Sequence, residues 1–290
     1  MKKFSIKQLE NFSEVKAHTI RIWEKRYRIF QPDRSKGNIR HYSLNDVKLL
    51  LNLVLLIKNG AKISELARTE TSAIDQKIKL LTADQARRNK AVSELIICMF
   101  SIDVEQLEDI LDSCILSWDV DITIRELIIP FLEKVQLLSY KDSSSEAHFA
   151  VTAIRRKLIL GLERVNPSTW MTKSALLFLG EGEHYDLLLL YMAYILKMKG
   201  MRVLYMGTNI PRENLKKILT VKKPDFLYTY IPHKQKFKMQ ELIPFLDEHL
   251  PDTTFVVAGC EKIVSPKESL RNVKFIHYKD VDNSLGLQSI

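Results

Sequence analysis

The sequence has few glycines and lacks any long uninterrupted apolar run. Nine glycines are spread over 290 residues, and none occurs from residue 73 to residue 160, which favours long helices in that part because glycine disfavours a helix interior. No stretch approaches the roughly 18 consecutive apolar residues of a membrane-spanning helix. The N-terminus carries cations but no apolar segment with a small-residue cleavage site, so it does not read as a secretory signal. We therefore expect a cytoplasmic protein without a membrane segment.

Cysteine is also scarce. Cys98, Cys114 and Cys260 lie far apart, without the paired spacing of a zinc site. Three isolated thiols are typical of a reducing compartment. The sequence contains no nucleophile elbow, no P-loop and no cluster of metal-ligating residues. We therefore do not expect an enzyme.

The positive charge is concentrated at one end of the chain. Apolar residues make up 46% of the sequence, enough for packed cores, and the length leaves room for about two or three domains. Residues 1–70 hold fifteen Lys and Arg against seven Asp and Glu, a net charge of +8, whereas the whole chain carries +9. One basic module, rather than a generally basic surface, is the pattern expected of contacts with nucleic-acid phosphates.

The basic module, residues 4–42, has the pattern of a winged helix-turn-helix. Ser5 and Gln8 form a capping-box pair that predicts the start of a first helix. In the second helix the apolar residues recur at helical spacing, and we expect Pro32 to end it. Residues 33–38 are turn-forming, and 39–42 predict a short strand. The buried side of the second helix consists of Ile20, Trp23 and Tyr27. A solvated basic helical hairpin remains the alternative.

Two groups of residues in this module are candidates for contact with double-stranded DNA. The first group is expected to face the major groove or its phosphates, and the second to hold the flanking backbone or minor groove. The first comprises Lys16, His18, Thr19 and Arg21, and the second Arg34, Lys36, Arg40 and Tyr42. Because such regulators meet two-fold operators, we expect a homodimer or homotetramer, and RNA polymerase is a further candidate partner.

The middle of the chain predicts helices only. A helix over 46–58, capped by Ser43 or Asn45, and a short helix over 63–68 complete the first domain, with a boundary at 69–72. Helices near 83–100, 104–117, 122–140 and 145–165 then predict a four-helix bundle. Their expected caps are Asp103, Asp121, and Ser143 or Ser144, and Pro130 is expected to kink or break the third helix. The domains are thus 1–72, 73–166 and 167–290.

Residues 167–290 predict a parallel sheet covered by helices on both faces. Apolar strands alternate with helices, an order typical of α/β domains. The strands cover about 175–180, 203–207, 225–231, 254–259 and 273–278, and the helices 185–199, 211–221 and 239–249. Ligands of such sheets bind at the carboxyl ends of the strands. The loops concerned are 180–184, 207–211, 231–234 and 259–262. The fold class is therefore multidomain, α followed by α/β.

The N-terminal module resembles the winged helix-turn-helix of the MerR family. The matching residues are Ser5-Ile6 with Leu9, Arg21 to Tyr27 in the form Arg-x-Trp-Glu-x-Arg-Tyr, and Arg40 with Tyr42-Ser43. This form resembles a branch in which the DNA-binding domain is joined to a helical bundle and a flavodoxin-like cobalamin-binding domain. The order of elements found here is the same. In light-responsive members, adenosylcobalamin lies between bundle and sheet domain and sets the oligomeric state.

The resemblance implies particular cobalamin-binding residues. His184 would be the lower axial ligand of the cobalt, and His148 the upper one. The third strand of such domains usually ends with a Ser near the nucleotide tail of cobalamin, and the fourth in Gly-Gly; Thr229 and Gly259 occupy these places. The chain departs from the motifs at several positions. They are Leu137 for Trp and Ala147 for Glu in the bundle, Gly182 for the acid and Leu187 for Gly beside His184, and a single glycine after Ala258.

Three hypotheses remain for the second half of the chain. It is a cobalamin or tetrapyrrole sensor that uses the two histidines, or a module that has lost the corrinoid site and serves oligomerisation or another ligand. A corrinoid carrier subunit of a methyltransferase would have the same bundle and sheet, but a carrier has no use for a basic DNA-binding module. The sequence thus predicts a DNA-binding transcriptional regulator.

Overall fold

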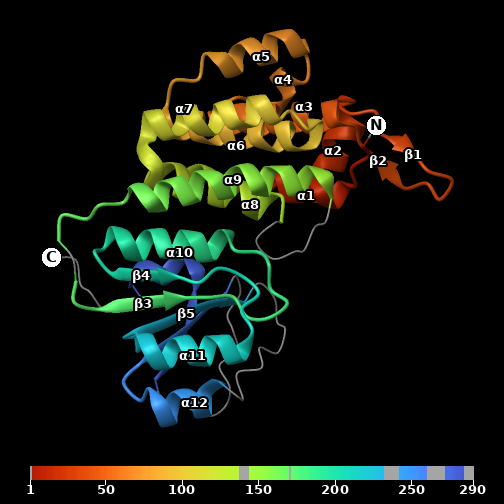
Figure 1. Ribbon diagram of the computed structural model, residues 1–290. Helices are drawn as coiled ribbons and strands as arrows, with labels where there is room; N and C mark the ends of the chain where they lie inside the picture. Colours follow the sequence, from red (N-terminus) through yellow and green to blue (C-terminus); the bar gives the residue numbers. More distant parts are fainter. Residues whose placement is uncertain (1, 137–143, 170, 232–241, 260–271, 284–290) are drawn as a thin grey trace. The chain divides into compact units, whose positions relative to one another are not determined.

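The structure, a computed structural model, describes residues 2–136, 144–169, 171–231, 242–259 and 272–283 (Figure 1). The chain divides into two compact units. We call the described residues up to Ala153 the front unit and those from Ile154 onward the rear unit. The division falls inside one helix, α9 (Ser145–Arg164). The two units are described separately.

The front unit begins with a helix-turn-helix and a hairpin. Helix α1 (Ile6–Ser13) has the expected capping box: the Ser5 hydroxyl accepts from the Gln8 amide, and the Ser5 amide donates to the Gln8 side chain at 2.9 Å. Helix α2 (Ala17–Tyr27) follows after a short turn. Strands β1 (Asp33–Arg34) and β2 (Arg40–His41) pair antiparallel. The segment before α1 is joined to the end of the hairpin by the Phe4–Tyr42 bridge.

The end of α2 differs from the expectation. The helix ends at Tyr27, well before Pro32, because Arg28 takes a left-handed conformation with φ 54°. The Arg28 amide donates to the Glu24 carbonyl oxygen at 3.0 Å and closes the last turn. A left-handed residue at this place is a common way to end a helix, although glycine is more usual there. Proline is therefore not what terminates α2.

The rest of the front unit is helical. Ser43 caps α3 through a capping box with Asp46, as one of the two expected caps. The helix over residues 71–79 begins inside the segment 69–72, where the sequence predicted a domain boundary. The elements are α3 (Leu44–Lys58), α4 (Ile63–Leu66), α5 (Thr71–Lys79), α6 (Asp84–Ser101), α7 (Val104–Thr123), the π-helix η1 (Ile124–Ile128), α8 (Ile129–Lys134) and α9.

Helix α7 is interrupted at Asp119, which has φ 66° and ψ 177°. Its carboxylate accepts from the Ile122 amide at 3.1 Å and so caps the segment that follows. The expected cap, Asp121, instead accepts from the side chain of Arg125 at 3.0 Å. The π-helical turn η1 directly precedes the helix that contains Pro130. A turn with i→i+5 bonds lets the chain pass a proline, which has no N–H to donate, without a full break.

The helix-turn-helix shares its core with the helices that follow. The rings of Phe4 and Phe12 contact that of Phe100 in α6, with centroids 4.8 Å and 5.2 Å away. Around this cluster Lys134 of α8 donates to Glu14 at 2.8 Å and to the Phe12 carbonyl oxygen at 3.3 Å. The DNA-binding candidates and the helical region are therefore packed against each other within one compact unit.

Two cysteines of the front unit are buried and free. Burial raises the pKa of Cys98 to about 12 and that of Cys114 to about 11, aided by nearby carboxylates. An unfolded thiol titrates near 8.5. The contribution of the two protonated thiols to the free energy of unfolding is therefore complete below about pH 8.5. It is lost as the pH rises toward 11, because in that range the thiols of the unfolded chain release their protons while those of the folded chain keep them.

We expect Cys98 and Cys114 to resist thiol–disulfide exchange with an added reagent at pH 8 in the folded chain and to react once it is unfolded. A Cys260→Ser variant leaves these two thiols alone to be counted with an aromatic disulfide reagent. Denatured protein serves as the reference for full reaction. Rapid labelling of either thiol in the folded chain would contradict the burial described here.

The rear unit contains a five-stranded parallel sheet with the order β4-β3-β5-β6-β7. Its elements are β3 (Ser174–Leu177), α10 (Leu187–Met198), β4 (Arg202–Tyr205), α11 (Arg212–Lys222), β5 (Phe226–Ile231), α12 (Leu242–His249), β6 (Thr254–Gly259), β7 (Val273–His277) and the 3-10 helix η3 (Tyr278–Asn283). Helix α10 covers one face, and α11 and α12 the other (Figure 1). The predicted strands and the parallel sheet are confirmed.

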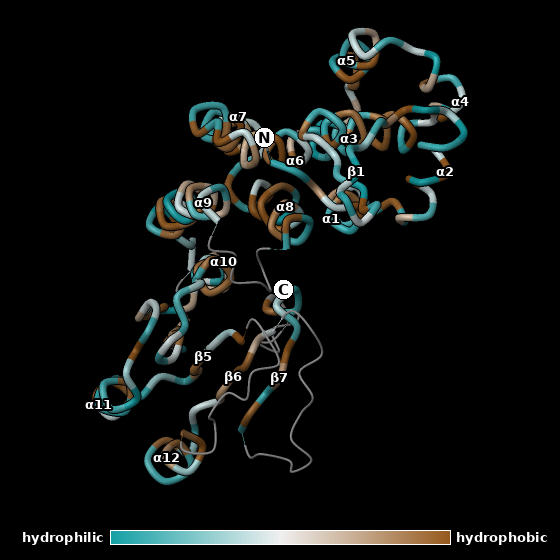
Figure 2. Tube along the Cα trace, turned by 90° about the vertical axis from the view of Figure 1, so that its right-hand side faces the viewer, coloured by the Kyte–Doolittle hydropathy of each residue, from teal (hydrophilic) through white to brown (hydrophobic). Residues whose placement is uncertain are grey.

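The two faces of the sheet are packed differently. Leucines of α11 and α12 join Phe178 and Phe255 in an apolar core, and both helices turn polar residues outward (Figure 2). Helix α10 is buried on all sides, from Leu187 to Leu196. No helix among the described residues is long and apolar enough to cross a membrane.

Candidate functional site

Helix α2 exposes a stripe of side chains opposite its buried face. His18, Arg21, Ile22 and Lys25 are all exposed, and their spacing of three and four residues places them on one side. On the other side Ile20 is fully buried, as predicted. Two cations, an imidazole and one aliphatic side chain thus form the outward surface of the helix.

A single carboxylate connects α2 to the hairpin. Glu24 accepts from Arg40 Nε at 3.0 and 3.1 Å, and from the hydroxyl of Tyr42 at 3.1 Å. The side chain of Arg34 also approaches Glu24, at 4.0 Å. Burial and the neighbouring Glu24 carboxylate raise the pKa of the Tyr42 phenol, so it remains a donor. Hydrogen bonds to a charged acceptor are stronger than neutral ones, so Glu24 fixes how the hairpin lies beside α2.

The eight DNA-contact candidates differ in exposure. Lys16, His18, Arg21, Arg34 and Lys36 are exposed; Thr19 and Arg40 are half-buried, and Tyr42 is fully buried. Lys16 lies 3.6 Å from Glu10, and the Thr19 hydroxyl lies 3.3 Å from the His18 ring. Arg34 donates to Asn38 at 2.6 Å. The sequence pattern singled out Arg40 and Tyr42 but gave no sign that both bind Glu24.

In the rear unit, the loop after β3 lies where the strand order reverses. The strand neighbours β4 on one side and β5 on the other, which is the switch point where ligands of such sheets bind. Asn209 holds this loop: its side chain accepts from the Gly182 amide at 2.8 Å, and its own amide donates to the Glu183 carbonyl oxygen at 2.9 Å. His184 follows directly and is exposed. Its ring is therefore accessible to a ligand.

A buried acid lies two residues beyond His184. Asp186 accepts from Arg155 Nε at 2.7 Å and from the hydroxyl of Tyr205 at 2.8 Å. Burial and the adjacent carboxylate raise the pKa of Tyr205. The three residues come from α9, the start of α10 and the end of β4, so the network fixes these elements within the rear unit. Sequence reasoning missed it, because 31 residues separate Arg155 from Asp186.

The ends of β5 and β6, where the resemblance places the nucleotide tail, are tightly packed. The Thr229 side chain is buried and donates to the Phe178 carbonyl oxygen at 3.0 Å. Tyr230 pairs with Ala258 across the two strands, and both are buried. Gly259 is buried beside Ile231. An aromatic side chain and a methyl group thus lie at the ends of these two strands, and either would obstruct a ligand that has to approach the backbone there.

His148, the other histidine candidate, lies in the front unit near the start of α9. Its side chain is exposed, whereas the neighbouring Ala147 is fully buried. Ala147 occupies the acidic position of the bundle motif. Because it is an alanine, this position supplies no carboxylate beside His148. Glu146, one residue earlier, forms an ion pair with Lys2 instead. Leu137 lies outside the described residues.

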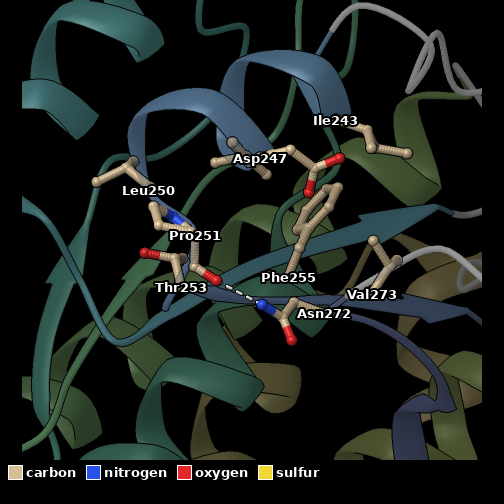
Figure 3. A pocket seen from close by; sticks show the side chains of 9 residues that line it. Ile243, Asp247, Leu250, Pro251, Thr253, Phe255, Asn272 and Val273 are labelled. Carbon is tan, nitrogen blue, oxygen red and sulfur yellow. Dashed lines mark hydrogen bonds between the residues drawn. The ribbon is translucent and has the colours of Figure 1, made fainter.

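A shallow pocket lies at the opposite edge of the sheet. Asp247 of α12, Thr253 before β6 and Asn272 before β7 contribute to its lining (Figure 3), and the Asn272 side chain donates to the Pro251 carbonyl oxygen. This is the amino end of the strands, away from the switch point. The part of the chain that the structure describes contains no group of three His, Cys, Asp or Glu able to hold a metal ion.

Comparison with known proteins identifies the front of the chain. Residues 4–72 match the family described as MerR HTH family regulatory protein. The match covers both helices, the hairpin and the residues joined by Glu24.

The similarity to known regulators extends through both units. The HTH-type transcriptional repressor CarA of Myxococcus xanthus is 24% identical over 223 residues, which span 76% of this chain and 73% of CarA. The repressor CarH of the same organism is 26% identical over 225 residues, 73% of each chain. The structure of a monomethylamine corrinoid protein from Methanosarcina barkeri covers 68% of this chain and 98% of its own, with a TM-score of 0.52 and 14% identity; this likeness concerns the fold alone.

The front domain and the parallel sheet together define a DNA-binding regulator with an additional α/β module. More particularly, residues 4–72 are a helix-turn-helix domain of the MerR type, and the second half of the chain has a fold similar to that of a corrinoid protein.

Proposed function

We propose that the regulator binds duplex DNA with the exposed stripe of α2 in the major groove and the β1–β2 hairpin, as a wing, on the flanking backbone. The observation that carries this proposal is the Glu24 network, which holds a basic hairpin beside a basic helix. A helix in the groove with cations at its side is the usual geometry of this class of reader. We propose no catalytic activity.

The direct experiment is selection of duplexes from a random-sequence pool by the full-length chain, followed by affinity measurement at fixed salt. A specific regulator should prefer the selected duplex over a scrambled one by about a thousandfold or more. Equal affinity for both duplexes would show that the chain binds DNA only nonspecifically, through its positive charge. A palindromic selected sequence would support binding as a dimer or tetramer. RNA polymerase remains a candidate partner.

Lys36 provides a prediction about phosphate contacts. It is exposed at the turn of the hairpin, where a cation reaches the backbone but not the bases. We expect Lys36→Ala to weaken binding to selected and scrambled duplexes alike, and to reduce the salt slope by about one. Lys79→Ala, which removes the same charge at the end of α5, should change neither the affinity nor the slope. A loss confined to the selected duplex would contradict a phosphate role.

For the rear unit we propose a module that keeps the cobalamin-binding-like fold without taking the nucleotide tail. Support comes from the buried Thr229, Tyr230 and Ala258 at the strand ends. Such a module would serve oligomerisation or another ligand. The second candidate, a corrinoid sensor, is favoured by His184, whose exposed ring at the switch point would suit a neutral imidazole ligand. A corrinoid bound there would supply a cobalt centre.

Mixing the purified chain with hydroxocobalamin distinguishes these two candidates. If the tail site is lost, the absorption spectrum stays that of free hydroxocobalamin and no colour co-elutes with the protein. Retention by the wild type but not by His184→Ala would establish the sensor. His249→Ala, which replaces another exposed histidine of the same unit, controls for nonspecific ligation. Cobinamide, which lacks the tail, tests whether the tail alone prevents binding.

A further inference from the structure

Two large apolar side chains are exposed in the described residues of the basic module. Ile22 on α2 is 52% exposed, and Ile39 before β2 is 60% exposed. Single exposed aliphatic residues are common on protein surfaces and usually mean nothing. The location of Ile22 is less ordinary, because it lies within the outward stripe formed by His18, Arg21 and Lys25.

Ile22 does not contribute to the packed side of its helix. That side is formed by Ile20, fully buried, and by the half-buried Trp23, while Glu24 binds the hairpin. A β-branched residue at an exposed helical position also has a lower helix propensity than Ala, Lys or Arg. Neither packing nor helix formation therefore explains an isoleucine at this position.

The charges around Ile22 indicate what it can contact. With Arg21 and Lys25 beside it, a second copy of the same stripe would bring like charges together. A polyanion is the complementary partner. On the major-groove edge of B-DNA the distinctive apolar group is the C5-methyl of thymine, and aliphatic side chains recognise thymine through this methyl group.

We propose that Ile22 reads a thymine C5-methyl group in the operator, as a specificity-determining contact. This inference rests on the proposed entry of α2 into the major groove. The neighbouring cations hold the phosphates or base acceptors, while Ile22 discriminates against bases that lack the methyl group. Cytosine methylated at C5 presents the same group at the same position and should satisfy the contact in part.

The test uses the full-length chain and the duplex obtained by selection. Each thymine is replaced in turn by uracil, which removes the methyl group and leaves the base pair intact. At one thymine in each half-site, the substitution should lower the affinity of the wild type about fourfold, the value expected for one methyl group withdrawn from an apolar contact. Ile22→Ala should bind the thymine and uracil duplexes equally.

A matched control separates this contact from a general effect of removing an isoleucine. Ile159 of α9 is 43% exposed and lies in the rear unit, so Ile159→Ala should keep the fourfold discrimination. If the wild type tolerates uracil at every thymine, the inference is overturned although specific binding stands. Discrimination that persists in Ile22→Ala would assign the contact to another residue. A chain without preference for any duplex would overturn the proposed function itself, and a change of oligomeric state in Ile22→Ala with unchanged discrimination would assign Ile22 to a contact between copies.

Discussion

Glu24→Ala should weaken binding to the selected duplex by about tenfold or more, although it removes a negative charge from a DNA-binding surface. Electrostatics alone predicts stronger binding, because the substitution makes the basic module more positive. The loss arises because Arg40 and Tyr42 both depend on this carboxylate for their position. Hydrogen bonds to a charged group contribute about 1.5–3 kcal/mol each, and about 1.4 kcal/mol is a factor of ten.

The experiment compares selected and scrambled duplexes at one salt concentration. Glu24→Gln keeps an acceptor for the Tyr42 hydroxyl and should show an intermediate loss. Glu70→Ala, with the same change of charge at an exposed position before α5, should leave binding unchanged or slightly stronger. If Glu24→Ala and Glu70→Ala have the same effect, the contacts of Glu24 with the hairpin do not contribute to DNA binding.

The second large effect concerns the rear unit. Asp186→Ala should lower its free energy of unfolding by about 3 kcal/mol, because it leaves the Arg155 guanidinium and the Tyr205 hydroxyl without their common partner. Arg155 is partly exposed, with a side chain 34% accessible, which places the loss at the lower end of the range for broken buried ion pairs. The measurement is hydrogen exchange of the β3 and β4 amides, which reports on this unit separately.

Two further variants make this prediction specific. Asp186→Asn retains an acceptor for Tyr205 but loses the charge that pairs with Arg155, so it should lie between wild type and Asp186→Ala. Asp247→Ala removes an exposed acid of α12 and should leave exchange unchanged. Since the pKa of Tyr205 is raised, its contribution holds below about pH 10 and is lost as the pH rises further. Equal exchange in wild type and Asp186→Ala would show that the network adds no stability.

The features that the sequence predicted correctly depend on residues that are close together in the chain. The predicted capping pair of Ser5 with Gln8 forms, and Ser43, one of the two residues expected to cap α3, does cap it. The rear strands were predictable because buried parallel strands are short apolar runs between helices. The end of α2 was not, since Arg28 takes a left-handed conformation that its residue type does not announce.

The features that sequence reasoning missed depend on contacts between distant residues. The break at Asp119 has no glycine or proline at that position to signal it. Glu24 was recognised only as part of a motif, because its partners are 16 and 18 residues away. For the site residues, sequence patterns selected exposed cations and histidines, but only packing reveals that Tyr42 and Thr229 are buried with their hydroxyls already bonded.

The aromatic contact between Phe4, Phe12 and Phe100 has a practical consequence for work on this regulator. A fragment cut after the family match, at residue 72, would strip Phe4 and Phe12 of their ring partner and open an apolar surface to water. Such a fragment should be prone to self-association, so its behaviour on DNA would be a poor guide to the intact chain. Experiments on DNA binding by a fragment should therefore use one that extends from the N-terminus through α6, α7 and α8.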